Sequence, residues 1–353
     1  MPDPDARLGA GWRRSTDRAV TTSSDATGLH LLVADEAQAY AWRTAATLAE
    51  PGLDADQWIG QACVTGSGRR AVVVYGPRTF TNREPLMQRG GFTAVVDLDT
   101  GAVTKLRERV SLAYHNPGCG AGERAVLSRL EMPAPTGGAA HTWIGTVDAA
   151  HPTRAIRAVR AAGQVTSTVP VGEKLIGSKG ASLMRIGAKG RTTTVATASA
   201  SPFRLLADGR DAVAFQVVQD GRTEFKRFAA GRISDHGSAP KGEIKLRAGA
   251  GGRVFAVGGR AKARMTEQLP PGWSAIDGLP DSDVSTTGAL VVSRATTGRE
   301  AAGRPAERPD SGQADRVDIS ARRVANGGPL GWTCTTTVGD RCGRSGVRAG
   351  PSA

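Results

Sequence analysis

Four stretches of the chain share one pattern, and this pattern decides the fold. They read CVTGSGRRAVVVYG at residues 63–76, CGAGERAVLSRL at 119–130, LADGRDAVAFQVV at 206–218 and RAGAGGRVFAVGG at 247–259. Each is a glycine-bearing turn, then arginine, then a short run of small or β-branched residues that is typical of a strand. The matching positions hold Ala71, Ala125, Ala212 and Val254, at spacings of 54, 87 and 42 residues. A weaker unit around Glu173–Ile176 fills the long middle spacing.

Further hairpins separate these units. The clearest reads FTAVVDLDTGAVTKL at residues 92–106 and alternates apolar and polar residues around the turn signal Asp99-Thr100-Gly101. Units of about 40 to 50 residues with four short strands predict propeller blades, because one such sheet must stack against neighbours to bury both faces. We count five or six units between Gly28 and Val292 and predict an all-β, β-propeller-like domain. A pair of β-sandwiches is the alternative.

Only residues 36–50 approach a helical pattern, and the turn signals that flank them favour a strand over Tyr40–Leu48. The composition then divides the chain into a disordered lead-in at 1–27, the propeller-like domain at 28–296, and a linker with a poorly structured tail at 297–353. Within the tail, VDISARRV at 317–324 is a candidate strand. The last stretch, GPLGWTCTTTVGDRCGRSGVRAGPSA, resembles a GC-rich gene read out of frame. A truncated or frameshifted end and an ordinary disordered tail are both open interpretations.

The chain is strongly basic, with a net charge of +13 over 353 residues and a pI of about 10.3. Arginines number 38 and lysines only 8, which is a bias expected from a GC-rich genome. The arginines are spread along the chain without the clustered aromatics of a nucleic-acid surface, so we expect no specific nucleic-acid partner. No stretch is long and apolar enough for a transmembrane helix. The first residues contain no apolar core of a signal peptide, which indicates a cytoplasmic protein or a true start elsewhere.

A resemblance bears on the compartment. The segments DADQWIGQACVTGSGRRAVVVYGPRTFTN at 54–82, GGFTAVVDLDTGAVTKL at 90–106 and SLAYHNPGCGAGERAVLSRL at 111–130 resemble the N-terminal, propeller-like region of very large secreted actinobacterial proteins of uncharacterised function. The resemblance implies a secreted or cell-surface setting, with further domains after this one. It carries no catalytic residues over to this chain. A cytoplasmic location is the alternative.

The cysteines point to the same compartment. Cys63 and Cys119 occupy nearly equivalent places before the glycine turns of consecutive units, and equivalent places in adjacent blades lie close together. We therefore predict a Cys63–Cys119 disulfide, which requires an oxidising compartment. Two buried free thiols or a reactive pair are the alternatives. The absence of a CxxC motif excludes a zinc ribbon.

Motifs for common chemistries are missing. The sequence has no GK[ST], HExxH or GxSxG, and its five histidines are never four residues apart, so we expect no cofactor and no metal. Gly66–Ala71 fits a dinucleotide fingerprint only formally, because a strand follows it where a helix is needed. Asp54, Asp56, Asp97 and Asp99 are candidate carboxylates for a glycosidase, but their positions next to turns favour structural roles.

Three tryptophans are candidate ligand-facing residues, because large aromatic rings at a propeller mouth can stack on sugars. They are Trp42, Trp58 and Trp143, and packing between blades is the alternative role. We predict a monomeric, non-enzymatic binding or scaffolding domain of a secreted or cell-surface protein, with an unknown protein or a cell-wall polymer as its partner. The alternatives are an enzyme acting on an extracellular polymer, as a glycan hydrolase or lyase, and an accessory fragment of a larger gene.

Overall fold

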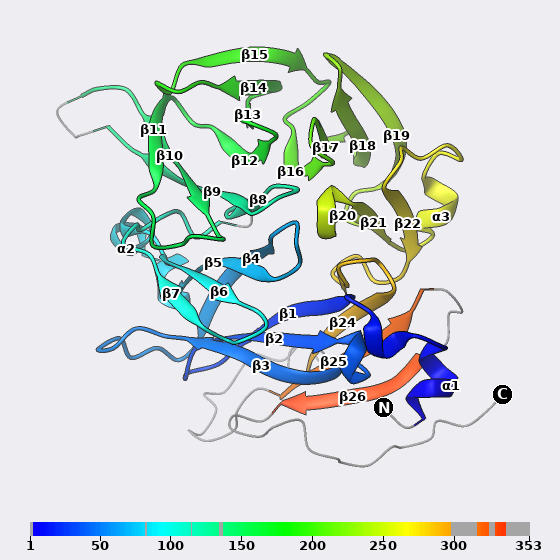
Figure 1. Cartoon of the computed structure of the whole chain (residues 1–353). Coiled ribbons are helices and arrows are strands. Elements are labelled where there is room, and N and C mark those ends of the chain that lie inside the picture. Colours follow the sequence, from blue (N-terminus) through cyan, green and yellow to red (C-terminus); the bar gives the residue numbers. More distant parts are fainter. Residues whose placement is uncertain are drawn as a thin grey trace, which may run out of the picture.

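The computed structural model describes residues 3–81, 83–113, 115–133, 137–297, 316–324 and 329–336. Their strands form seven β-sheets that are arranged around an axis (Figure 1). We number these sheets as blades 1 to 7 in chain order. The predicted all-β propeller is confirmed. Blades 2 to 6 lie wholly within the predicted domain at 28–296, whereas blades 1 and 7 extend beyond its two ends.

The strands follow one another around the ring. Blade 1 contains β1 (Arg18–Ser24), β2 (Leu29–Asp35) and β3 (Ala41–Leu48). Blade 2 contains β4 (Trp58–Val64), β5 (Arg70–Pro77), β6 (Phe92–Asp97) and β7 (Val103–Lys105). Blade 3 contains β8 (Gly118–Cys119), β9 (Arg124–Glu131), β10 (His141–Asp148) and β11 (Arg157–Ala162). Blade 4 contains β12 (Thr166–Val171), β13 (Lys174–Lys179), β14 (Ser182–Ile186) and β15 (Thr192–Thr197).

The second half of the ring is built in the same way. Blade 5 contains β16 (Phe203–Asp208), β17 (Ala212–Gln219), β18 (Arg222–Ala229) and β19 (Arg232–Pro240). Blade 6 contains β20 (Ile244–Ala248), β21 (Val254–Gly258) and β22 (Trp273–Asp277), of which the last two are parallel. Blade 7 contains β23 (Asp283–Val284), β24 (Leu290–Thr297), β25 (Arg316–Arg323) and β26 (Pro329–Thr336). Short helices are α1 (Pro4–Leu8), α2 (Glu84–Arg89) and α3 (Ala261–Arg264).

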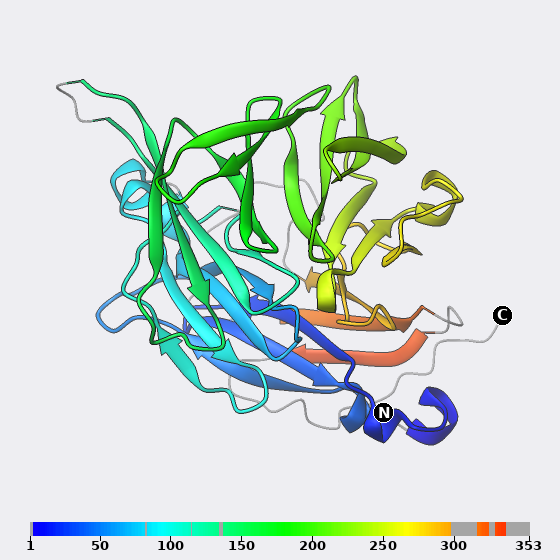
Figure 2. The same ribbon diagram turned by 45° about the horizontal axis from the view of Figure 1, so that its top comes forward.

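The core lies between neighbouring blades. Seven clusters of buried apolar side chains each join two adjacent blades, so the packing continues around the whole ring. Figure 2 shows these blades side by side around the axis. The second strand of a blade is covered on both faces by its neighbours. For this reason β5 reads as an uninterrupted apolar run, in which Val72, Val73 and Val74 are all fully buried. The short apolar runs after the glycine turns are therefore the structural centre of each blade.

The glycine turns meet at one end of the axis. Gly66 N donates to Gly122 O at 2.8 Å, Gly251 N donates to Gly66 O at 2.8 Å, and Gly209 N donates to Gly252 O at 3.0 Å. A Cβ on Gly66 would lie 1.8 Å from the carbonyl oxygen of Ala121, a separation that no side chain tolerates. The recurring glycine thus has a tertiary cause, since turns from blades 2, 3, 5 and 6 come together where there is no room for side chains.

Blade 1 departs from the pattern of the other blades. Arg18, at the start of β1, pairs with the turn of blade 7 through Thr286 N to Arg18 O at 2.8 Å. Just after its end, Asp25 O accepts a bond of 2.9 Å from the N–H of Trp58, the residue that begins β4. β1 therefore runs antiparallel to β4, the first strand of blade 2. Its direction is that of β5, the second strand of that blade. Within blade 1, β1 is the strand next to the axis, where it contacts β4 of blade 2 and β23 of blade 7.

The predicted disordered lead-in at residues 1–27 is wrong for much of its length. It contains helix α1, a 3₁₀ turn at Trp12–Arg14 and the whole of β1. Ala19 is fully buried, and Trp12 is 8% exposed in the cluster between blades 1 and 7. Few apolar residues mark this segment, because β1 is held largely by pairing with β2 and by polar contacts to blade 7. The sequence pattern alone therefore does not reveal it.

The structure also corrects the predicted tail at 297–353. The candidate strand VDISARRV is confirmed as β25, and GPLGWTCTTTV contributes β26 to the same blade. Residues 298–315 and 337–353 lie outside the described residues. The strand expected over Tyr40–Leu48 is confirmed as β3, which follows a 3₁₀ turn at Glu36–Gln38. None of the helices among the described residues has the length and apolar character needed to cross a membrane.

Candidate functional site

The predicted disulfide is present. Cys63 at the end of β4 and Cys119 in β8 are joined by an S–S bond of 2.04 Å, with their Cα atoms 5.7 Å apart. The bond connects the inner strands of blades 2 and 3 immediately before the two glycine turns that touch through Gly66 and Gly122. It therefore covalently links blades 2 and 3 close to the end of the axis where the glycine turns meet.

Two of the three candidate ligand-facing tryptophans are core residues. Trp42 is 6% exposed and packs between blades 1 and 7. Trp58 is 1% exposed and lies against Tyr75 and Phe92, with ring centroids 6.1 and 6.4 Å away. The prediction that they face a ligand is wrong, and the alternative role as packing between blades is confirmed for both. Their positions at the beginning of strands did not distinguish the two roles, because the blade stacking that buries them is a tertiary feature.

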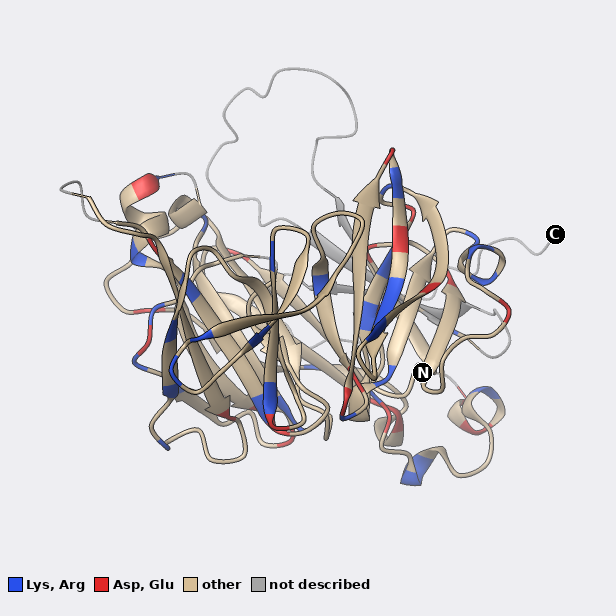
Figure 3. Cartoon of the chain, turned by 90° about the horizontal axis from the view of Figure 1, so that it is seen from above, with Lys and Arg blue, Asp and Glu red and all other residues tan. Residues whose placement is uncertain are grey.

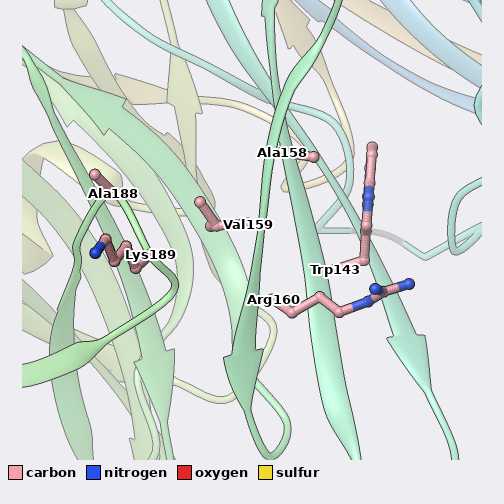
Figure 4. A pocket seen from close by; sticks show the side chains of 6 residues that line it. All are labelled: Trp143, Ala158, Val159, Arg160, Ala188 and Lys189. Carbon is pink, nitrogen blue, oxygen red and sulfur yellow. The ribbon is translucent and has the colours of Figure 1, made fainter.

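Trp143 is different, because it lines an open hollow of about 440 Å³ (Figure 4). We call this hollow the aromatic hollow. Trp143 comes from β10, its cross-strand neighbour Arg160 comes from β11, and Lys189 comes from the turn after β14 in blade 4. Figure 4 shows the side chains of Trp143 and Arg160 next to each other on one side of blade 3, and the amine of Lys189 on the opposite side, pointing away from them. The remaining lining residues are small or aliphatic: Ala158, Val159 and Ala188.

The geometry keeps the Trp143 ring in place. The ring lies over Gly145 on the same strand, where a Cβ would be 2.3 Å from the ring carbon Cη2. The guanidinium carbon of Arg129 is 5.7 Å from the ring centroid, within the range of a cation–π contact. Glycine at position 145 is therefore a requirement of this site, since any larger side chain would displace the ring.

The charge around the aromatic hollow is positive. Glu131 accepts hydrogen bonds from Arg160 Nε at 2.8 Å and from Arg129 Nη2 at 2.9 Å. These bonds, the one from Arg160 first, hold the pKa of Glu131 below its usual value, so the carboxylate stays ionised. One carboxylate thus faces two guanidinium groups, and the exposed Lys189 adds a further cation. The arrangement suits a partner that carries both a flat surface and negative charge.

The candidate carboxylates have structural partners. Asp97 Oδ1 accepts from the backbone N–H groups of Asp99 and Thr100 at 3.1 and 3.0 Å, which builds the turn after β6. Asp99 pairs with Arg18 at 2.6 Å and with Arg69 at 3.0 Å. Asp56 pairs with Arg78. These contacts confirm the structural interpretation for Asp56, Asp97 and Asp99.

Other chemical constellations are incomplete in the described part of the chain. His236 Nε2 lies 2.8 Å from Ser234 Oγ, but its buried Nδ1 has no hydrogen-bond partner among the described residues. A serine nucleophile would need that nitrogen to be oriented by an acid. No group of three or more His, Cys, Asp or Glu residues that could hold a metal ion occurs in the described ranges.

A second hollow, of about 250 Å³, lies between blades 5 and 6 at the axis end opposite the glycine turns. Its lining includes Gln216, and the sequence analysis missed it. The sequence does contain one indication of this site: Gln216 is the one polar residue in the apolar run AVAFQVV, which forms a buried strand. A buried amide in such a place needs partners, which makes it informative about a site.

Comparison with known proteins identifies no family for this chain. No protein-family model matches the sequence, and no curated protein matches it. Among solved structures, TolB from Acinetobacter baumannii is similar with a TM-score of 0.45 and 11% identity, over 88% of this chain and 61% of that chain. This chain therefore spans about three fifths of the TolB chain. The β-propeller domain of the Trilobed protease from Pyrococcus furiosus, which has an open velcro topology, gives a TM-score of 0.41 and 9% identity over 88% of this chain and 78% of that one.

Proposed function

We propose that this chain is a binding propeller of a secreted or cell-surface protein and that the aromatic hollow holds an anionic partner, such as an acidic cell-wall polymer. One observation carries the proposal: Trp143, Arg160 and Lys189, from two blades and three chain segments, line one open hollow. An indole face contributes apolar stacking area, and the cations contribute charge attraction. Neither requires a catalytic group.

Two further features support this assignment. The Cys63–Cys119 disulfide is stable only where thiols are not kept reduced, which favours an exported protein. Lys and Arg residues occur on several blades and are interspersed with Asp and Glu (Figure 3). A net charge of +13 therefore draws anionic polymers towards the whole surface, and a specific hollow is needed to orient them.

Affinity electrophoresis of the full chain tests the proposal. The protein is run through gels that contain polygalacturonate, which is anionic, or dextran, which is neutral, at physiological salt. We expect retardation by polygalacturonate and a loss of affinity of about tenfold in Trp143→Ala, the size typical of an aromatic contact at the centre of a binding site. Arg185→Gln removes an exposed cation from neighbouring strand β14 and serves as the matched control.

The results separate specific from general attraction. Equal retardation of the wild type, Trp143→Ala and Arg185→Gln would show that the net charge alone is responsible and would reject the hollow as the site. Release of new reducing ends from the polymer would instead support the enzymatic alternative. Light scattering of the purified protein in solution measures its oligomeric state, and we infer that it is a monomer.

A further inference from the structure

The second hollow is lined by two largely buried polar side chains, Gln216 and Thr223, each with a donor group that makes no hydrogen bond within the described part of the chain. Gln216 is 2% exposed, and its Oε1 accepts from the N–H of Leu246 at 3.1 Å. Its Nε2 donates to no acceptor among the described residues, although the side chain lines the hollow. Thr223, also 2% exposed, lines the same space, and its hydroxyl makes no hydrogen bond within the described part of the chain. Neither atom is among the buried side-chain atoms that lack a hydrogen-bond partner, so both are accessible from the hollow and can reach a ligand in it.

Three cations surround these donors. Arg204 is the second residue of the inner strand of blade 5, Lys245 lies on the inner strand of blade 6, and Lys241 lies in the turn that joins the two blades. Lys245 forms an ion pair with Asp281, whose side chain is 79% exposed. The ring of Phe203 and the backbone of Gly242 complete this part of the wall. Val218 and Ile244 make the rest of the wall apolar. The polar side chains in the lining are donors and cations, and no carboxylate is among the lining residues.

We propose that this hollow is a binding site for a small anionic group, a phosphate or a carboxylate, which accepts hydrogen bonds from Gln216 and Thr223 and is neutralised by Arg204, Lys241 and Lys245. This site is separate from the aromatic hollow, which involves blades 3 and 4. The inference goes beyond the proposed function and does not depend on it.

The size of the hollow limits the ligand. A volume of about 250 Å³ corresponds to roughly eight water molecules at their share of liquid volume. It therefore admits a single phosphate or a uronic acid ring, and a longer polymer could enter only with one end or one side group. The bond from Leu246 N–H occupies Oε1 of Gln216, so the amide Nε2 is the end of this side chain that can donate to a ligand.

Isothermal titration of the full chain with inorganic phosphate, glucuronate and neutral glucose tests the proposal at low and physiological salt. We expect binding of phosphate or glucuronate and none of glucose, and whichever anion binds identifies the chemistry. Lys241→Gln removes an exposed cation from a turn and should weaken binding about tenfold, as expected for one charge-assisted hydrogen bond. Gln216→Glu keeps an acceptor for Leu246 N but places a carboxylate in the site, and it should abolish binding.

A change of opposite sign makes the test stringent. Asp281→Asn releases Lys245 from its ion pair, so the anion should bind several-fold more tightly. Lys189→Gln, in the aromatic hollow, should leave this affinity unchanged while it weakens polymer binding. Equal effects of Lys241→Gln and Lys189→Gln on anion binding would overturn the proposal, because general charge would then account for it. No binding of either anion by the folded wild type would overturn it as well.

Discussion

Asp17 and Thr286, which are 269 residues apart, join the two ends of the propeller ring. Asp17 Oδ1 accepts from Thr286 Oγ1 at 3.1 Å and from the N–H of Thr287 at 2.7 Å, and its other oxygen accepts from the hydroxyl of Tyr40. Thr286 Oγ1 in turn accepts from the N–H of Arg18 at 3.1 Å. No described strand of blade 1 pairs with a described strand of blade 7. This carboxylate, the bond from Thr286 N to Arg18 O and the apolar cluster around Trp12 therefore close the ring.

The ring closure predicts a large effect of Asp17→Ala. The substitution leaves the buried hydroxyls of Tyr40 and Thr286, and the backbone N–H of the exposed residue Thr287, without their acceptor, so we expect the free energy of unfolding to fall by about 3 kcal/mol. Urea unfolding followed by tryptophan fluorescence measures it. Asp54→Ala is the control, because Asp54 is exposed, and it should change stability by less than about 0.5 kcal/mol. Similar values for the two variants would show that the contact to blade 7 contributes little.

The glycine turns predict opposite outcomes for two alanine substitutions. A Cβ on Gly66 would lie 1.8 Å from Ala121 O, whereas a Cβ on its hydrogen-bond partner Gly122 would meet nothing within 4 Å. Gly66→Ala should therefore cost about 3 kcal/mol or more, because the turns must separate. Gly122→Ala should be nearly neutral. Thermal unfolding of both variants is the measurement, and a tolerated Gly66→Ala would contradict the close approach of the turns.

The disulfide predicts a redox-dependent stability. A bond that closes a loop between residues 56 positions apart restricts the unfolded chain, which corresponds to about 4 kcal/mol in the loop-entropy treatment. Urea unfolding with and without a reductant should reveal this difference in the wild type. The double variant Cys63→Ser, Cys119→Ser should unfold at the midpoint of the reduced protein under both conditions. If the reductant lowers the midpoint of the double variant equally, the effect does not come from this bond.

Two histidines predict a loss of stability in mild acid. Burial lowers the pKa of His115, and burial together with the nearby charge of Arg227 lowers the pKa of His236. Below their unfolded pKa of about 6.5, the unfolded chain takes up protons that the folded protein does not, so stability falls as the pH drops. The fall starts near pH 6.5 and ends at the lower, folded pKa values.

The test is the urea midpoint measured between pH 8 and pH 5. The wild-type midpoint should be constant above about pH 7 and decrease below it, whereas the double variant His115→Gln, His236→Gln should show a flatter profile. The carboxylates with lowered pKa values, such as Asp99, which loses ion pairs with Arg18 and Arg69 when protonated, act only at lower pH. A wild-type midpoint that does not change between pH 8 and pH 5 would contradict the prediction.

The repeated strand units and the Cys63–Cys119 disulfide could both be predicted from local sequence. Strands on both sides of a glycine turn are specified by turn chemistry and by short apolar runs, which is why the unit that contains Ala71 could be recognised along the chain. Equivalent places in consecutive units put Cys63 next to Cys119 for the same reason. When a local pattern repeats, equivalent positions of consecutive units are expected to be neighbours in space. The structure confirms the repeated sheets and the disulfide that were inferred in this way.

The candidate sites were only partly predictable. Trp42, Trp58 and Trp143 look alike in sequence, and the first two are buried because adjacent blades cover them. Trp143 is only partly buried against the cluster between blades 2 and 3, and of the three it alone also lines a hollow. The second hollow, with Gln216 and Lys241, is lined by residues of four strands and one turn. No spacing of residues along the sequence predicts that arrangement.

By itself, the sequence determined a β-rich repeat, its glycine turns and one disulfide, because each depends on a few neighbouring residues or on their repetition. Only the tertiary structure decided that β1 belongs to the ring, that Asp17 closes it, and that Gly66 lies where turns of several blades meet. It also decided which aromatic and polar side chains line open space. These outcomes depend on contacts between residues far apart in the chain, and the free energy of such contacts is not expressed by any local pattern.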